Sequence, residues 1–251
     1  MNFLCLASLF MLFQLSLGWT ANYICKLAGF VLFLAGLGEL EQLCRIQRRG
    51  SEKLSIPQRN IGRSLEKLMI AACADPSERN EDIPDYGSVR ISVLEYMKGR
   101  TKLCVLLCAC AAGLSLALDL AKPPAWISNV VSCIMGTAVS LASLALLDLA
   151  VRFIVTNERN AVSSVRFVNN KSEVYRLRAA LNRASLCTVV NLVCDIVNRL
   201  VPISGVQSFF GFFAAISKIT LYVFAVMTVY SFNKVRADSN KKYDSENKNG
   251  G

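Results

Sequence analysis

The sequence predicts an all-α integral membrane protein, a helical bundle with amphipathic helices on its cytosolic side. Apolar residues make up 53% of the 251 residues and charged residues only 18%, whereas soluble domains carry about 25% charged residues. The apolar residues also lie in long blocks, and the last block, residues 184–232, is divided by Pro202 and Gly205. Because proline ends a helix and glycine tolerates a tight turn, this block predicts a hairpin of two membrane helices.

Charge and residue usage narrow the functional classes. The net charge is +10, and beside apolar blocks this excess favours anionic lipid headgroups over nucleic acid as partner. The chain has no histidine, the commonest general base and metal ligand, and its 10 cysteines contain no Cys-x-x-Cys pair. Most of the cysteines lie in apolar stretches, as buried thiols do. We therefore expect no metal site, no cofactor and no enzyme activity.

Residues 1–38 form an apolar N-terminal segment that is interrupted at residues 18–22 and by Lys26. Three interpretations stay open: a helical hairpin, a helix lying in the membrane, or a signal peptide over residues 1–18. A signal peptide begins with a basic region, which the start Met1-Asn2-Phe3 lacks.

Residues 39–102 form the predicted cytosolic amphipathic region. Ser55-Ile56-Pro57 is a start signal for a helix over residues 58–73. Its apolar residues share one face and its basic residues the other, which is typical of a helix in a membrane interface and also of a surface helix in a soluble domain. The expected membrane-binding residues are Arg59, Ile61, Arg63, Leu65, Lys67, Leu68 and Ala72. A weaker amphipathic helix is expected over residues 88–99.

Residues 103–151 predict a transmembrane hairpin. Its helices, residues 103–120 and 126–147, are separated by Lys122-Pro123-Pro124-Ala125, where two prolines force a reversal. The second helix has 22 residues without a charge, enough to span a bilayer core. A basic connection over residues 152–183 follows, then the C-terminal hairpin over 184–232. The second half of the connection, residues 172–183, is expected to be helical and to run into the hairpin. The polar tail, residues 233–251, is expected to be disordered.

The C-terminal hairpin carries the residues expected to pack helices and to form homo-oligomers. Small residues in Gly211-x-x-x-Ala215 allow two helices to approach closely. Asp195 and Arg199 are one turn apart and favour an ion pair, toward which Lys218 can reach. The complete set is Gly205, Gly211, Ala215, Ser217, Asp195, Arg199 and Lys218. The alternative is a transporter or channel in which Asp119, Asp148, Asp195 and Lys218 line an ion path.

The distribution of basic residues predicts the topology. Residues 40–102, 152–183 and 233–251 hold 24 of the 28 Lys and Arg residues, and the turns at 122–125 and 202–205 hold one. The positive-inside rule therefore places the long segments and the C-terminal tail in the cytosol.

The order of these parts resembles the peroxins that drive peroxisome proliferation, peroxin eleven and its glycosomal relatives. The segments that carry the resemblance are Asn22-Tyr23-Ile24-Cys25-Lys26-Leu27, the stretch from Leu118-Asp119-Leu120 to Trp126-Ile127, Cys194-Asp195 with Gly205, and Gly211-Phe212-Phe213-Ala214-Ala215-Ile216-Ser217 with Leu221-Tyr222. The Gly-Arg-Asp-Lys start of many members is absent.

This resemblance implies a multi-pass protein of the peroxisomal or glycosomal membrane that promotes organelle proliferation. It also implies self-association and contact with the organelle-fission machinery. The expected mechanism is shallow insertion of the helix over residues 58–73 into the cytosolic leaflet, with anchoring by the C-terminal hairpin. A further alternative is an endomembrane tetraspan scaffold behind a cleaved signal peptide, which N-terminal sequencing of the mature protein would reveal.

Overall fold

All the secondary structure described in the computed structural model is α-helical. The model describes residues 2–13, 19–46, 86–160, 168, 170–201 and 203–249. Its helices are α1 (Asn2–Leu12), α2 (Trp19–Ile46), α4 (Tyr86–Ala121), α5 (Ala125–Asn160), α6 (Lys171–Leu200) and α7 (Ser204–Asn249). All except α1 contain a stretch that is long and apolar enough to cross a membrane. The expected helical membrane bundle is therefore confirmed.

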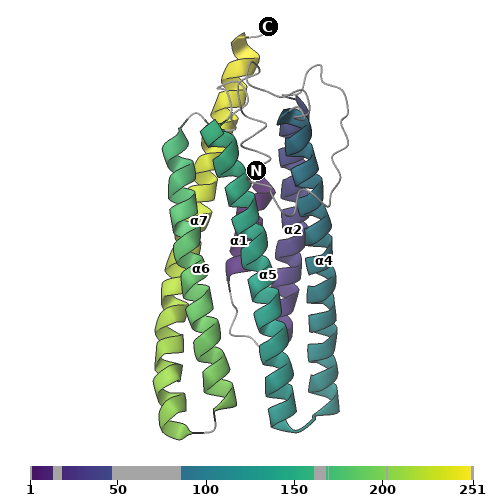
Figure 1. Ribbon diagram of the computed structural model, residues 1–251, viewed down its shortest axis with the longest axis vertical. Helices are drawn as coiled ribbons and strands as arrows, with labels where there is room; N and C mark the ends of the chain where they lie inside the picture. The colour runs from purple at the N-terminus through teal and green to yellow at the C-terminus, as the bar shows by residue number, and fades with distance from the viewer. Residues whose placement is uncertain are drawn as a thin grey trace, which may run out of the picture.

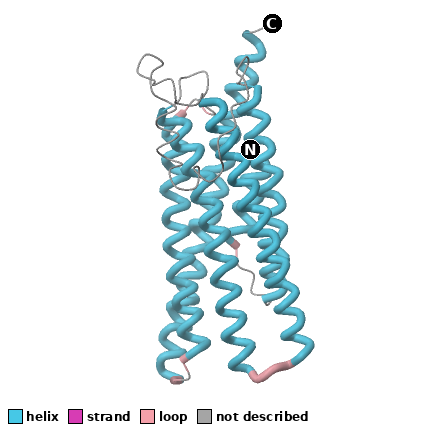
Figure 2. The backbone as a smooth tube through the Cα atoms, turned by 45° about the vertical axis from the view of Figure 1, so that its right-hand side comes forward, coloured by secondary structure: helices cyan, strands magenta, loops and turns pink. Residues whose placement is uncertain are grey.

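The five long helices run along a common axis, with both short turns at one end (Figures 1 and 2). The α4–α5 turn and the α6–α7 turn define what we call the turn end. The C-terminus lies at the other end, which we call the open end (Figure 1). Because α4 and α6 run toward the turn end and α5 and α7 run away from it, the first residues of α4 and α6 also lie at the open end.

The α4–α5 turn follows from local chemistry. Lys122 has a φ of 46°, the left-handed conformation that commonly ends a helix, and its N–H donates to the Leu118 carbonyl at 3.1 Å. Pro123 and Pro124 follow, and the N–H of Ile127 donates to the Pro124 carbonyl at 3.0 Å. A proline tolerates the first turn of a helix because the N–H that it lacks has no partner there.

In the structure the described part of the N-terminal segment consists of two antiparallel helices, as in the first of its three interpretations. Helix α1 lies antiparallel to α2, with Leu4 beside Gly36 and Met11 beside Gly29. It also contacts α7, because the Phe13 and Tyr222 rings stack at 5.3 Å and the Cys5 thiol donates to the Val229 carbonyl at 3.5 Å. Its 11 residues reach only about 16 Å, so α1 is a half-length helix that lies among full-length ones (Figure 1), with Phe3 and Leu6 exposed.

The boundary expected between the helices over 88–99 and 103–120 is absent, and the expected continuation of residues 172–183 into the C-terminal hairpin is present. Helix α4 joins the segments 88–99 and 103–120, and α6 joins the basic residues 172–183 to the apolar residues that follow. No proline interrupts either helix, and the Thr101 hydroxyl bonds back to the Met97 carbonyl at 2.8 Å, within α4 itself. The polar part of each helix is therefore a continuation of a membrane helix.

The expectation of a disordered tail after Asn233 is wrong, because α7 continues to Asn249. Phe232, Val235 and Ser239 extend the buried side of the helix, with at most 2% of each exposed. The Asp238 carboxylate accepts a hydrogen bond from the Asn170 N–H at 2.7 Å. Packing against the start of α6 thus stabilises a helix that a polar sequence of this kind would not maintain by itself.

Polar groups are buried where the helices extend past their apolar runs at the open end. Lys98 of α4 forms an ion pair with Glu41 of α2. Asn157 and Glu158 of α5 are at most 2% exposed and are joined by a hydrogen bond of 3.2 Å. Arg90 of α4 is 1% exposed. The bundle therefore continues beyond its apolar part as a packed polar section.

The predicted membrane-binding helix over residues 58–73, with all seven of its named residues, lies outside the residues that the structure describes.

Candidate functional site: the polar seam between α6 and α7

The α6–α7 hairpin is joined by polar side chains in its apolar section. Asn191 of α6 is 1% exposed and Ser217 of α7 is 8% exposed. The Ser217 hydroxyl lies 3.1 Å from the Asn191 Oδ1 and 3.1 Å from the Ala214 carbonyl, so it donates to one or the other. An interhelical hydrogen bond of this kind holds membrane helices together where the hydrophobic effect does not. Sequence reasoning included Ser217 but missed Asn191.

The buried threonines of this seam are satisfied within their own helices. The Thr188 hydroxyl donates to the Ala184 carbonyl at 2.9 Å, and the Thr228 hydroxyl donates to the Phe224 carbonyl at 2.7 Å. Both hydroxyls are paired one turn back within their own helices, whereas the Asn191–Ser217 contact joins α6 to α7.

Asp195 and Arg199 form the expected ion pair, with the Arg199 Nε 3.0 Å from the Asp195 Oδ2. Their side chains are 25% and 33% exposed, respectively. Lys218 is half-buried. Within the described residues no ion pair or hydrogen bond joins it to Asp195. The structure therefore brings together two of the three expected charges.

The small residues of α7 have different surroundings. A Cβ added to Gly211 would lie 3.8 Å from the Asn198 Oδ1, so Gly211 faces α6 within the same chain. Ala215 is exposed, and Gly205 is exposed with nothing within 4 Å of an added Cβ. Of the three, Gly211 thus packs inside the hairpin, while Ala215 and Gly205 remain open to neighbours outside the chain.

A close helix approach lies in the N-terminal hairpin instead. A Cβ added to Gly36 would lie 2.6 Å from the Leu4 Cγ and 2.8 Å from the Leu4 backbone N. At Gly29 an added Cβ would lie 2.9 Å from the Met11 Cγ. The seven-residue spacing of these glycines puts them on one side of α2, a small-residue signal that the sequence does carry.

The side chain of Lys26 caps the C-terminal end of α1. It is 5% exposed, and its Nζ donates to the Met11 carbonyl at 2.8 Å. The last carbonyls of a helix have no partner within the helix and carry partial negative charge. A cation there both donates a hydrogen bond to such a carbonyl and balances its charge. The sequence showed Lys26 as an interruption of an apolar stretch and gave no partner for it.

The other candidate charges do not converge. Asp148 pairs with Arg152 on the surface of α5 at 2.7 Å. Asp119 is exposed and accepts a hydrogen bond from Thr20 at 3.4 Å. Across the described ranges no three His, Cys, Asp or Glu residues are grouped as metal ligands would be.

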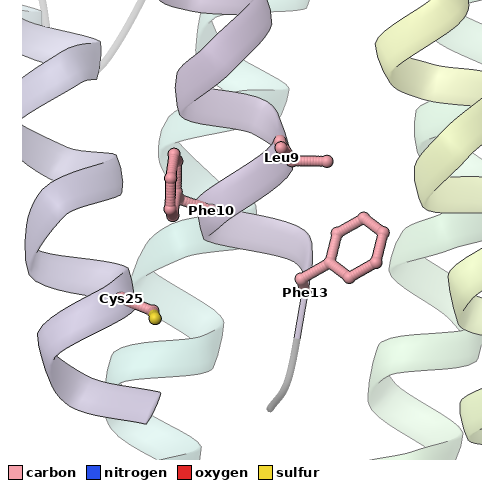
Figure 3. A pocket seen from close by; sticks show the side chains of 4 residues that line it. All are labelled: Leu9, Phe10, Phe13 and Cys25. Atoms are coloured by element: carbon pink, nitrogen blue, oxygen red, sulfur yellow. The ribbon is translucent and has the colours of Figure 1, made fainter. Parts of the chain in front are cut away.

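A cavity of about 200 Å³ lies between α1 and α2, lined by Leu9, Phe10, Phe13 and Cys25. Figure 3 shows Phe10 on the side of α1 nearer Cys25, and Leu9 and Phe13 on the other side. The lining offers no charged group and no hydrogen-bonding pair. We assign no chemistry to this cavity.

Neither a family model, nor a curated protein, nor a solved structure matches this chain. The fold and the seam define the class of protein directly. It is a multi-pass helical membrane protein whose C-terminal hairpin is held by a buried polar contact and a local ion pair.

Proposed function

We propose that the protein is a non-enzymatic remodelling factor of the peroxisomal or glycosomal membrane, acting by amphipathic-helix insertion and self-association. One observation carries the proposal. The segment that contains residues 58–73 joins the end of α2 to the start of α4, and both of these helix ends lie at the open end of the bundle. The chain segment with the predicted amphipathic helix is therefore attached at both of its ends to the same end of the bundle.

Attachment of the segment at one end of the bundle would confine its insertion to one leaflet, which is how it would curve the membrane. Helix α7 has 46 residues and extends about 69 Å, while a bilayer core is about 30 Å thick. The turn end has only short connections, so the excess length projects at the open end. A helix that inserts shallowly from that side expands one leaflet and bends the bilayer. The basic residues of the long segments assign this face to the cytosol by the positive-inside rule.

Self-association is assigned to the outer face of α7. Ala215 is exposed there, and large apolar side chains around it are exposed as well, namely Phe209, Phe212, Phe213, Ile216 and Ile219. A small residue within a bulky apolar face lets a second copy approach closely. The organelle and the fission machinery as partner follow from the resemblance to the peroxins.

The amphipathic helix is tested with a peptide of residues 55–74. It should be disordered in water, because an isolated helix of this length is marginal. On anionic vesicles it should become helical, as Ile61, Leu65 and Leu68 enter the bilayer and the cations meet headgroups. Leu65→Glu should abolish binding, and the matched control Leu65→Met should retain it. A wild-type peptide that stays unstructured on every vesicle composition would contradict insertion.

The full-length protein gives the functional readout. Reconstituted in vesicles that contain phosphatidylserine, it should produce tubules or smaller vesicles in electron micrographs, and Leu65→Glu should lose this effect. A tagged copy in cells should coincide with a peroxisomal marker. Unchanged vesicle shape at all protein densities would contradict remodelling, and a different compartment would contradict the organelle.

A transporter or channel is the second candidate, favoured by α1. A half-length helix whose carbonyl end is capped by buried Lys26 resembles the broken helices that line transport sites. Ion or solute flux in the same vesicles distinguishes the two functions. Flux that Asp195→Asn or Lys26→Met abolishes supports transport, whereas remodelling without flux supports the first proposal.

A further inference from the structure

Three helices carry a cation that lies over an aromatic ring. The Arg100 guanidinium of α4 lies 5.2 Å from the centroid of the Tyr96 ring, and its Nε donates to the Tyr96 hydroxyl at 3.0 Å. Arg183 of α6 lies 5.9 Å from the Phe224 ring of α7. Lys234 of α7 lies 5.1 Å from the Tyr230 ring. We call these three pairs the boundary cations.

The boundary cations lie on the same side of the uncharged runs of their helices. Arg100 precedes the uncharged residues 103–118 of α4, and Arg183 precedes the uncharged residues 184–194 of α6; both runs head toward the turn end. Lys234 follows the uncharged residues 219–233 of α7, which head away from it. All three lie on the open-end side of these runs, at different heights: Arg183 is level with Phe224, which precedes Lys234 by ten residues of α7, or about 15 Å. Aromatic rings and long basic side chains occupy the interfacial level of membrane proteins.

None of the boundary cations has an acidic partner among the described residues. Neighbouring cations differ in this respect. Arg152 pairs with Asp148 at 2.7 Å, and Arg176, two turns before Arg183 on α6, pairs with Glu173 at 3.0 Å. Arg183 and Arg100 are exposed. Stacking on a ring leaves the N–H donors of a guanidinium available to an external anion.

We propose that the boundary cations bind the headgroups of anionic phospholipids in the leaflet at the open end. The charge of these side chains and their position on the bundle indicate phosphate headgroups as the partner. Guanidinium and ammonium groups pair with phosphate oxygens, and each of these cations lies on the open-end side of the uncharged run of its helix, from where a long basic side chain can extend to the headgroups. The inference rests on the membrane bundle alone and holds whether or not residues 58–73 insert.

The experiment measures lipid selectivity of the full-length protein in bilayers. Spin-labelled phosphatidylserine and phosphatidylcholine report which lipid is immobilised at the protein surface. The wild-type protein should immobilise phosphatidylserine preferentially, and added salt should reduce the preference. Arg183→Gln should lower the affinity at its position by up to about five-fold, as the loss of one basic residue near an anionic surface implies. The triple variant Arg100→Gln, Arg183→Gln, Lys234→Gln should lose most of the preference.

Arg176→Gln is the matched control, since Arg176 lies on the same helix but is already paired; its selectivity should equal that of the wild type. Phe224→Leu keeps the Arg183 charge and removes the ring, so it should reduce selectivity less than Arg183→Gln does. Circular dichroism checks that each variant retains its helices. If the triple variant does not fold, the single variants test the proposal.

Three results would overturn the proposal. The first is equal immobilisation of both lipids by the wild-type protein. The second is a loss in Arg176→Gln as large as that in Arg183→Gln. The third is loss of the preference when inorganic phosphate replaces chloride at equal ionic strength, because the site would then be a general anion site.

Discussion

At the scale of single residues, Gly36 shows how little space separates α1 from α2. A methyl group there would meet both the side chain and the backbone of Leu4, whereas Gly38 on the same helix has nothing within 4 Å of an added Cβ. Gly36→Ala should therefore destabilise the protein by about 1–3 kcal/mol, as overpacking does, and Gly38→Ala should have a much smaller effect. Unfolding in mixed micelles with increasing SDS measures both. Equal stability of the two variants would contradict the close approach of α1.

Cys44 gives a prediction of pH dependence at the same scale. It lies near the end of α2, past the apolar stretch, and is 2% exposed. Burial raises the pKa of its thiol from 9.0 to about 11. Because the thiolate is the reactive form, Cys44 should resist a maleimide at neutral pH until the protein unfolds. Mass spectrometry of labelled peptides checks this, and native-state labelling as fast as in SDS would contradict it.

The same shift has a consequence for stability. The unfolded thiol ionises near 9.0 and the folded thiol near 11. The contribution of Cys44 to folding is therefore complete below pH 9 and is lost as the pH rises toward 11. Cys44→Ala should remove this part of the pH dependence, although it also lowers stability through the cavity that it leaves.

At the scale of elements, the α6–α7 hairpin depends on the Asn191–Ser217 contact. Ser217→Ala removes the hydroxyl and should cost about 1 kcal/mol, the range measured for interhelical hydrogen bonds in membranes. Thr220→Val is the matched control, because the Thr220 hydroxyl bonds only to its own helix, at the Ile216 carbonyl. The SDS titration used for Gly36 compares them. A larger cost for the control would contradict an interhelical role for Ser217.

The two small residues of α7 should separate folding from self-association. Gly211 faces Asn198 of α6, so Gly211→Leu should disturb the hairpin itself. Ala215 is exposed, so Ala215→Leu should leave the stability of the chain unchanged and reduce crosslinking between copies. Crosslinking yields and SDS titrations on both variants test this. Undiminished crosslinking in Ala215→Leu would place the self-association surface elsewhere.

At the scale of the whole molecule, the two ends of the bundle predict opposite accessibility. Protease added to intact organelles should cut the connection between α2 and α4 over residues 78–86 and an epitope fused after Gly251. An epitope inserted at Lys122–Pro124 should be protected, because that turn lies at the other end. The reverse pattern would invert the orientation assigned by the basic residues.

The sequence by itself determined the apolar helices and their turns. About 20 consecutive apolar residues predict a membrane span. Breaks between helices are predicted from the residues that end a helix or allow a turn, here Pro123, Pro124, Pro202 and Gly205. The Asp195–Arg199 pair belongs to this group, since residues four apart on a helix are neighbours by geometry. Each of these properties is local, so no knowledge of distant residues is needed.

The tertiary structure alone decided which distant groups meet. Gly36 meets Leu4, Lys26 meets the Met11 carbonyl, and Asn191 meets Ser217. It also decided that α7 continues past Asn233, because Val235 is buried and Asp238 reaches Asn170. The composition of the tail indicated disorder, which holds only when a segment has nothing to pack against. Which side chains of two helices meet depends on how the helices are aligned against each other in the bundle. The residue pattern along one helix does not determine that alignment.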